Sequence, residues 1–189
     1  MRKFALPVLL SAMLAATAGA TEPPADLVAE ARGLAKTYVT ELEGALLAAI
    51  EEGGAPHAID VCGAEAPGIA TAISTKSGWA VGRTALRVRN PRNAPSPQER
   101  AVLMRFLERT AADEDLKKME YAAVVDTGGR KYLHYMKAIP TGQICLKCHG
   151  SDVDPETMRA IRARYPADAA TGFELGALRG AFTFVRPLD

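Results

Sequence analysis

The sequence lacks an excess of charge of either sign. Among its 189 residues, 23 Lys and Arg stand against 22 Asp and Glu, so the formal net charge is +1. A protein surface that binds nucleic acid needs a basic excess, so this balance gives no support for a nucleic-acid partner. The remaining composition, with 48% hydrophobic and 24% charged residues, is ordinary for a folded protein and excludes a disordered or collagen-like chain.

Long apolar runs are also lacking beyond the N-terminus. No internal stretch reaches the roughly 18 apolar residues that a membrane-spanning helix requires, and no internal repeat or low-complexity segment is present. The length is typical of a single domain.

The first twenty residues have the features of a secretory signal peptide. Basic Arg2 and Lys3 precede an apolar segment, and a small-residue A-x-A site ends at Ala20. We therefore expect cleavage after Ala20, so that residues 21–189 form an exported, periplasmic domain that is not held in a membrane. An uncleaved anchor is the alternative.

Cysteine is scarce, and its three positions carry most of the functional information. An exported protein meets an oxidising compartment in which cysteines normally pair, but Cys62, Cys145 and Cys148 cannot all pair with one another. Cys145 and Cys148 belong to Cys145-Leu146-Lys147-Cys148-His149, which is the C-x-x-C-H motif of c-type haem attachment. In such a motif the two thiols form thioethers with the haem vinyl groups, and the adjacent histidine ligates the iron.

Two other interpretations of the motif have less support. A thioredoxin-like thiol–disulfide pair needs a strand–turn–helix context, whereas the segments 140–143 and 150–152 around the motif predict a loop. Structural zinc needs four ligands, and the sequence has no second C-x-x-C and no H-x-x-x-H. The motif therefore predicts one covalent haem c held by Cys145, Cys148 and His149.

The N-terminal half predicts two helices. Apolar residues at three- and four-residue steps indicate a helix over 25–52 that ends at Gly53-Gly54, and its apolar stripe is suited to a core or to a homodimer contact. A second helix is expected from Pro56 to Lys76, with Cys62 on its apolar face. Pro67 should kink or divide that helix one turn after Cys62.

The remaining pattern alternates between short strands and helices. We expect short strands or extended segments at 79–83 and 85–89, and strands at 119–126, 130–139 and 179–186. Helices are expected from Ser96 through Ala111 and from Asp154 to Tyr165. A small, mostly antiparallel sheet with flanking helices and a long N-terminal helix defines an α+β fold.

The second axial ligand of the iron stays open on the residues alone. Methionine and histidine are the usual partners in electron-transfer haems, and the candidates are His57, His134, Met104, Met119, Met136 and Cys62. Four arginines are candidates for pairing with haem propionates, although a solvated basic patch explains them equally well: Arg83, Arg87, Arg89 and Arg92.

Several blocks, in order, resemble the haem-binding, PAS-like Tll-type domain family. They are Ala58-Ile59-Asp60-Val61-Cys62, Ala66-Pro67, Gly82-Arg83-Thr84, Arg89-Asn90-Pro91, Tyr135-Met136-Lys137-Ala138-Ile139-Pro140, Cys145 to Gly150, Thr171-Gly172 and Arg179-Gly180-Ala181. The resemblance covers nearly all of residues 21–189, and Ala138 replaces a proline that is common in the family. It implies a PAS-like fold with one c-type haem, ligated by His149 on one side and by Cys62 on the other.

The resemblance also bears on function. Family members occur as stand-alone exported proteins and as sensor modules, and this chain looks like the stand-alone kind. We expect a non-enzymatic c-type cytochrome for low-potential electron transfer or redox sensing, with a redox or signalling protein as its partner, because a thiolate ligand stabilises ferric iron. The alternative is a sensor in which nitric oxide or carbon monoxide displaces Cys62. A peroxidase would need an open iron site, for which the sequence gives no evidence.

Overall fold

The structure, a computed structural model, describes residues 21–188, so the predicted signal peptide at residues 1–20 lies outside the described residues. The α-helices are α1 (Ala25–Ser77), α2 (Pro97–Ala111), α3 (Leu146–His149) and α4 (Pro155–Arg164). The strands are β1 (Ala80–Thr84), β2 (Glu120–Thr127), β3 (Arg130–Pro140) and β4 (Leu178–Leu188), and the short 3-10 helices are η1 (Pro91–Asn93) and η2 (Leu116–Lys118). In this part of the chain no helix is both long and apolar enough to cross a membrane.

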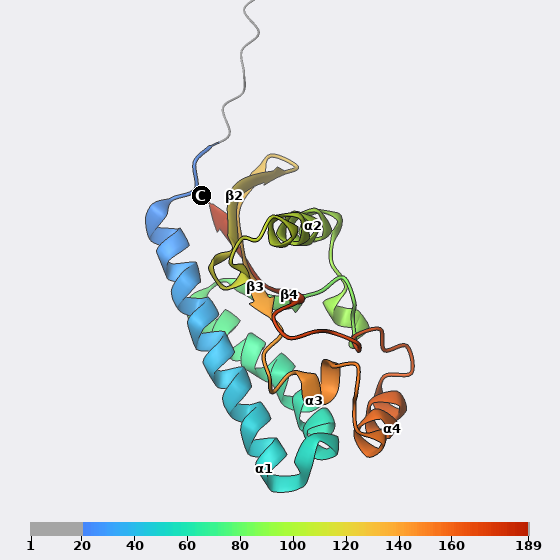
Figure 1. Ribbon diagram of the computed structural model, residues 1–189. Coiled ribbons are helices and arrows are strands. Elements are labelled where there is room, and N and C mark those ends of the chain that lie inside the picture. Colours follow the sequence, from blue (N-terminus) through green and yellow to red (C-terminus); the bar gives the residue numbers. More distant parts are fainter. Residues whose placement is uncertain (1–20, 189) are drawn as a thin grey trace, which may run out of the picture.

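Helix α1 consists of two helical arms joined by a sharp reversal. The backbone leaves helical geometry at Gly53 (φ −150°, ψ 19°) and Gly54 (φ 74°, ψ −175°), which is where the sequence predicts the first helix to end. The conformation of Gly54 is essentially restricted to glycine. Figure 1 shows the chain turning back at this point, so the arm that carries Cys62 returns toward the sheet.

Proline 67 does not divide the second arm. Non-helical backbone angles inside α1 are confined to Gly53 and Gly54, so a division of the helix after Cys62 is wrong, while a kink there stays a prediction. Ala66 is fully buried beside it, and in the next turn the hydroxyl of Thr71 donates a 2.9 Å hydrogen bond to the carbonyl of Pro67. Because proline has no N–H, the carbonyl of Gly63 lacks its usual helical hydrogen bond.

Four antiparallel strands form one sheet in the order β1-β4-β3-β2. The predicted hairpin is confirmed: β2 and β3 pair from Glu120–Lys137 to Thr127–Arg130, and Gly128 and Gly129 both have positive φ in the turn. Positive φ at both central residues matches the right-handed twist of hairpin strands.

Helices cover both faces of the sheet (Figure 1). The first arm of α1 lies on one face, where Tyr38 packs with Leu133, Tyr135 and Phe184. Helix α2 lies on the other face and packs its own core, formed by Val102, Leu103, Phe106, Leu116, Met119, Met136, Ala138, Leu178 and Ala181. The predicted α+β class is confirmed, and the stripe of the first helix serves as core within the chain.

The structure differs from two local expectations, a strand at 85–89 and a loop at the C-x-x-C-H motif. Residues 85–89 do not form a strand, because the ladder with β4 ends at the Thr84–Ala181 pair and the Ala85 N–H donates instead to the Asn93 carbonyl at 3.2 Å. The C-x-x-C-H motif does not lie in an open loop, because its last four residues form the single helical turn of α3. Short-range hydrogen bonds, such as the one from the His149 N–H to the Cys145 carbonyl at 2.8 Å, hold the motif in this helical turn.

Replacement of Gly54 tests the importance of the reversal in α1. Gly54→Ala places a Cβ at φ 74°, ψ −175°, and we expect a loss of about 1–3 kcal/mol in the free energy of unfolding. Urea denaturation followed by circular dichroism measures this change. The control is Gly33→Ala, at an exposed position of the first arm where an added Cβ meets no atom within 4 Å. Alanine should be neutral or stabilising there. Equal effects of the two substitutions would contradict the requirement for glycine at the reversal.

Candidate haem site

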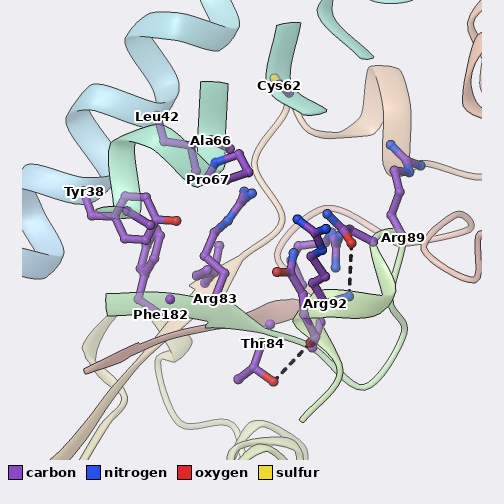
Figure 2. Close-up of a pocket in the computed structure, with 18 of the residues that line it drawn as sticks. Tyr38, Leu42, Cys62, Ala66, Pro67, Arg83, Thr84, Arg89, Arg92 and Phe182 are labelled. Carbon is purple, nitrogen blue, oxygen red and sulfur yellow. Dashed lines mark hydrogen bonds between the residues drawn. The ribbon is translucent and has the colours of Figure 1, made fainter. Parts of the chain in front are cut away.

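A large cavity lies between the second arm of α1, β1, the loop that follows β1, and the C-x-x-C-H segment. Its volume is about 680 Å³, which is within the usual range for a cofactor site. Cys62, Cys145, Cys148 and His149 all line it, although Cys62 is distant from the others in the sequence. Figure 2 shows Cys62 on α1 on the far side of the cavity from β1.

A small apolar cluster holds the two cysteine-bearing segments together. Ile59, one turn before Cys62, packs with Cys148 and with Ile161 of α4. The end of helix α4 also lies close beside Cys62, because a Cβ added to Gly63 would collide with Nε of Arg164 and would lie 2.8 Å from the hydroxyl oxygen of Tyr165. The packing of α4 on α1 therefore fixes where Cys62 stands relative to the C-x-x-C-H segment.

The three thiols are not joined by disulfide bonds. Burial raises the pKa of Cys62, and the positive charge of Arg83 partly opposes this effect. Burial also raises the pKa of the Cys148 thiol, the charge of Arg89 lowers it, and a thiolate at Cys62 raises it. These pKa effects agree with a site where Cys62 faces the C-x-x-C-H segment.

His149 is oriented by a hydrogen bond at the back of its ring. The Nδ1 atom lies 2.6 Å from the carbonyl oxygen of Ala170, so this nitrogen carries the proton and Nε2 keeps its lone pair. Burial, followed by the charges of Arg179 and Arg89, lowers the pKa of His149 well below its usual value. A neutral imidazole whose Nδ1–H is bonded to a backbone carbonyl is the form that ligates metals.

The backbone around His149 is fixed as well. The carbonyl of His149 accepts a 2.8 Å hydrogen bond from Phe173 N–H, and the carbonyl of Gly150 accepts one of 2.8 Å from Gly172 N–H. The ring of Phe173 packs edge-on against the imidazole at a centroid distance of 6.3 Å. The loop 168–173 therefore positions the histidine from behind.

The other candidate axial ligands do not line this cavity. Met119 and Met136 are fully buried in the core on the α2 face, and Met104 is exposed on α2. His134 is buried on a separate, smaller cavity, with Nε2 2.9 Å from the Thr183 hydroxyl. His57 lies 3.5 Å from Glu52 near the reversal of α1. Of the six candidates, Cys62 shares the cavity with His149.

The four arginines considered from the sequence have different surroundings. Arg83, Arg89 and Arg92 line the cavity, whereas Arg87 lies over the ring of Phe173 and donates to the carbonyl of Ala169. Arg89 already has partners: it pairs with Asp168 at 2.9 Å and donates to the Cys148 carbonyl at 2.6 Å.

Sequence reasoning missed one arginine of the cavity. Arg179, near the start of β4, lines the cavity and lies over the ring of Phe173 at 5.2 Å. Burial and the charges of Arg89 and Arg83 lower its pKa to about 10. Its place in the Arg179-Gly180-Ala181 block was the only signal in the sequence, and nothing there gives its environment.

The cavity fits a haem in its donors, size and charge. It brings together two thiols in C-x-x-C-H spacing, a histidine with a free Nε2 and a third thiol, which is a suitable donor set for a covalently held, doubly ligated iron. Arg83, Arg92 and Arg179 add positive charge without a carboxylate within 4 Å among residues 21–188. Such a surplus favours an anionic ligand.

Fold and site together define an α+β domain in which one cavity joins a C-x-x-C-H segment to a distant cysteine. The chain belongs to the Tll0287-like family, whose sequence model matches residues 13–187. The crystal structure of the cyanobacterial heme-protein Tll0287 is similar, with a TM-score of 0.61 and 26% sequence identity over 85% of this chain and 96% of that one. No curated protein matches the chain.

The Arg89–Asp168 ion pair provides a test of what holds the loop 168–173 in place. Its side chains are 11% and 7% exposed, so Asp168→Asn leaves a nearly buried guanidinium without its counter-charge. We expect a loss of about 3 kcal/mol in the free energy of unfolding, measured by urea denaturation. The control, Glu114→Gln, breaks the exposed Arg109–Glu114 pair and should cost less than about 1 kcal/mol. A similar loss from both substitutions would show that burial of the pair is unimportant.

Proposed function

We propose that this protein is an exported, single-haem c-type cytochrome that acts in low-potential electron transfer or redox sensing. Cys145 and Cys148 hold the haem covalently, and His149 and Cys62 ligate its iron. The observation that carries the proposal is that Cys62 lines the same cavity as the C-x-x-C-H segment, while the other five candidate ligands do not. The description of the similar cyanobacterial protein as a heme-protein supports it.

The haem, when bound, supplies a centre that exchanges one electron. The protein's own residues set the conditions for that exchange. The Ala170 carbonyl holds the Nδ1 proton of His149 and keeps Nε2 available. Cys62 contributes a negative charge when it ligates as thiolate, which stabilises the ferric state and lowers the potential.

The proposed role is non-enzymatic, because Cys62 and His149 together would hold the iron and would leave no open site for a substrate. The partner is then a redox or signalling protein. Export follows from the N-terminal pattern at residues 1–20. A gas-sensing role would require the Cys62–iron bond to give way in the reduced protein.

Covalent attachment predicts a specific mass. The intact mass of the purified protein should equal the chain from Thr21 plus one haem after acid–acetone extraction, because thioethers survive that treatment. Cys145→Ser or Cys148→Ser leaves at most one thioether, and the double variant should lose its haem to the organic phase. Cys62→Ser is the matched control and should keep the haem. Full extraction of haem from the unaltered protein would overturn covalent attachment.

Replacement of Cys62 tests the axial ligand. Cys62→Ala should convert a low-spin ferric spectrum into a high-spin one and remove thiolate charge-transfer bands, because the iron loses one of its two protein ligands. Met136→Leu, a swap of similar volume in the other core, is the control and should remain low-spin.

A second substitution at Cys62 tests the charge of the ligand. Cys62→Met replaces an anion by a neutral thioether and should raise the midpoint potential in a potentiometric titration. A lower or unchanged potential contradicts thiolate ligation. In the unaltered protein, rapid binding of carbon monoxide on reduction would favour gas sensing over electron transfer.

A further inference from the structure

The cavity holds more positive charge than its own residues neutralise. Four arginines line it, against the carboxylates of Glu43 and Glu99. Glu99 already accepts a 2.8 Å hydrogen bond from the Ser96 backbone N–H in the cap of α2, and Glu43 is exposed. Guanidinium groups in a partly desolvated cavity are stabilised by anions, so the ligand of this cavity should bring negative charge of its own.

Only some of these arginines are available to such a ligand. Arg89 is engaged by Asp168 and the Cys148 carbonyl. Arg179 donates a 3.3 Å hydrogen bond to the Arg87 carbonyl, and of the neighbouring charges it has the largest lowering effect on the pKa of His149. It therefore lies at the end of the cavity where the C-x-x-C-H segment stands.

Arg83 reaches the cavity from the sheet. It extends from β1, opposite Phe182 in the ladder, and Figure 2 shows its side chain rising toward Ala66 and Pro67 of α1 beside Tyr38. Among residues 21–188 no carboxylate lies within 4 Å of its guanidinium. Its neighbour is the Tyr38 hydroxyl, whose pKa is raised by burial and lowered by the charge and hydrogen bond of Arg83. A guanidinium without a carboxylate partner is suited to bind a planar anion through two parallel hydrogen bonds.

The chemistry of the porphyrin determines which anion this is. Its vinyl groups and its two propionates occupy opposite parts of the ring, so thioethers at Cys145 and Cys148 turn the carboxylates away from α3. We propose that Arg83 binds a haem propionate and thereby sets the orientation of the haem plane between Cys62 and His149. This inference rests on the proposed function, and it adds a carboxylate-binding residue to the site.

The test separates propionate binding from haem binding. Arg83→Gln should retain one covalent haem by intact mass, because the thioethers are unchanged. Loss of the guanidinium should shift the propionate bending mode in the resonance Raman spectrum and raise the propionate pKa by about one to three units. The midpoint potential should then fall with rising pH across the range near neutrality, because the ionised propionate stabilises ferric iron.

Matched variants show whether the changes in the Raman mode and the pH profile come from the haem propionate. Arg130→Gln removes an equal charge at the distant hairpin and should leave the Raman mode and the pH profile unchanged. Besides the two cysteines of the motif, the other titratable or charged residues that line the cavity with Arg83 are Tyr38, Glu43, Cys62, Glu99, His149, Tyr165, Arg89, Arg92 and Arg179. Adding Glu43→Gln or Glu99→Gln to Arg83→Gln should preserve the pH-dependent segment, because it belongs to the haem; its loss in either double variant overturns the proposal.

A conservative variant keeps the test informative if Arg83→Gln does not fold. Arg83→Lys retains the charge but not the fork, so it should shift the Raman mode while changing the pH profile less than glutamine does. An unchanged Raman mode in Arg83→Gln, or in Arg83→Lys where that alone folds, overturns propionate binding by Arg83. Absence of haem from the unaltered protein would instead refute the proposed function itself.

Discussion

The reversal at Gly53 and Gly54 is the constraint on which the site depends. It returns the chain along itself, so that one arm of α1 packs on the sheet while the other stands over the cavity (Figure 1). Without it, Cys62 would continue away from the sheet. The α4 contact at Gly63 and the cluster around Ile59 then fix the returning arm against the C-x-x-C-H segment.

Local sequence signals predicted most of the fold. The capping box at Ser96 and Glu99, the glycine turn of the hairpin and the break at Gly53-Gly54 all act within a few residues, and the structure has them where the patterns place them. The differences concern two elements. The Ala85 N–H bonds to the carbonyl of Asn93 instead of to β4, which ends the expected strand at 85–89, and the helix continues through Pro67.

The candidate site divides in the same way. The motif formed by Cys145, Cys148 and His149 can be recognised from its spacing alone. Nothing in composition or spacing indicates that Cys62 lies near the motif, and that expectation came from the family resemblance. In the structure Cys62 lines the same cavity as the motif. Arg179 and the Ala170 carbonyl could not be found from the sequence, because each acts through a contact with a distant segment. Their effects on His149 require the folded chain.

The burial of Cys148 limits when its sulfur can react. Only 8% of this residue is exposed, since it is enclosed by Ile59 and Ile161 from two different helices. A buried thiol reacts more slowly than an exposed one, so chemistry at this sulfur depends on how far the chain has packed. If the proposed function is correct, attachment of haem at Cys148 would compete in time with the packing of α1 against α4.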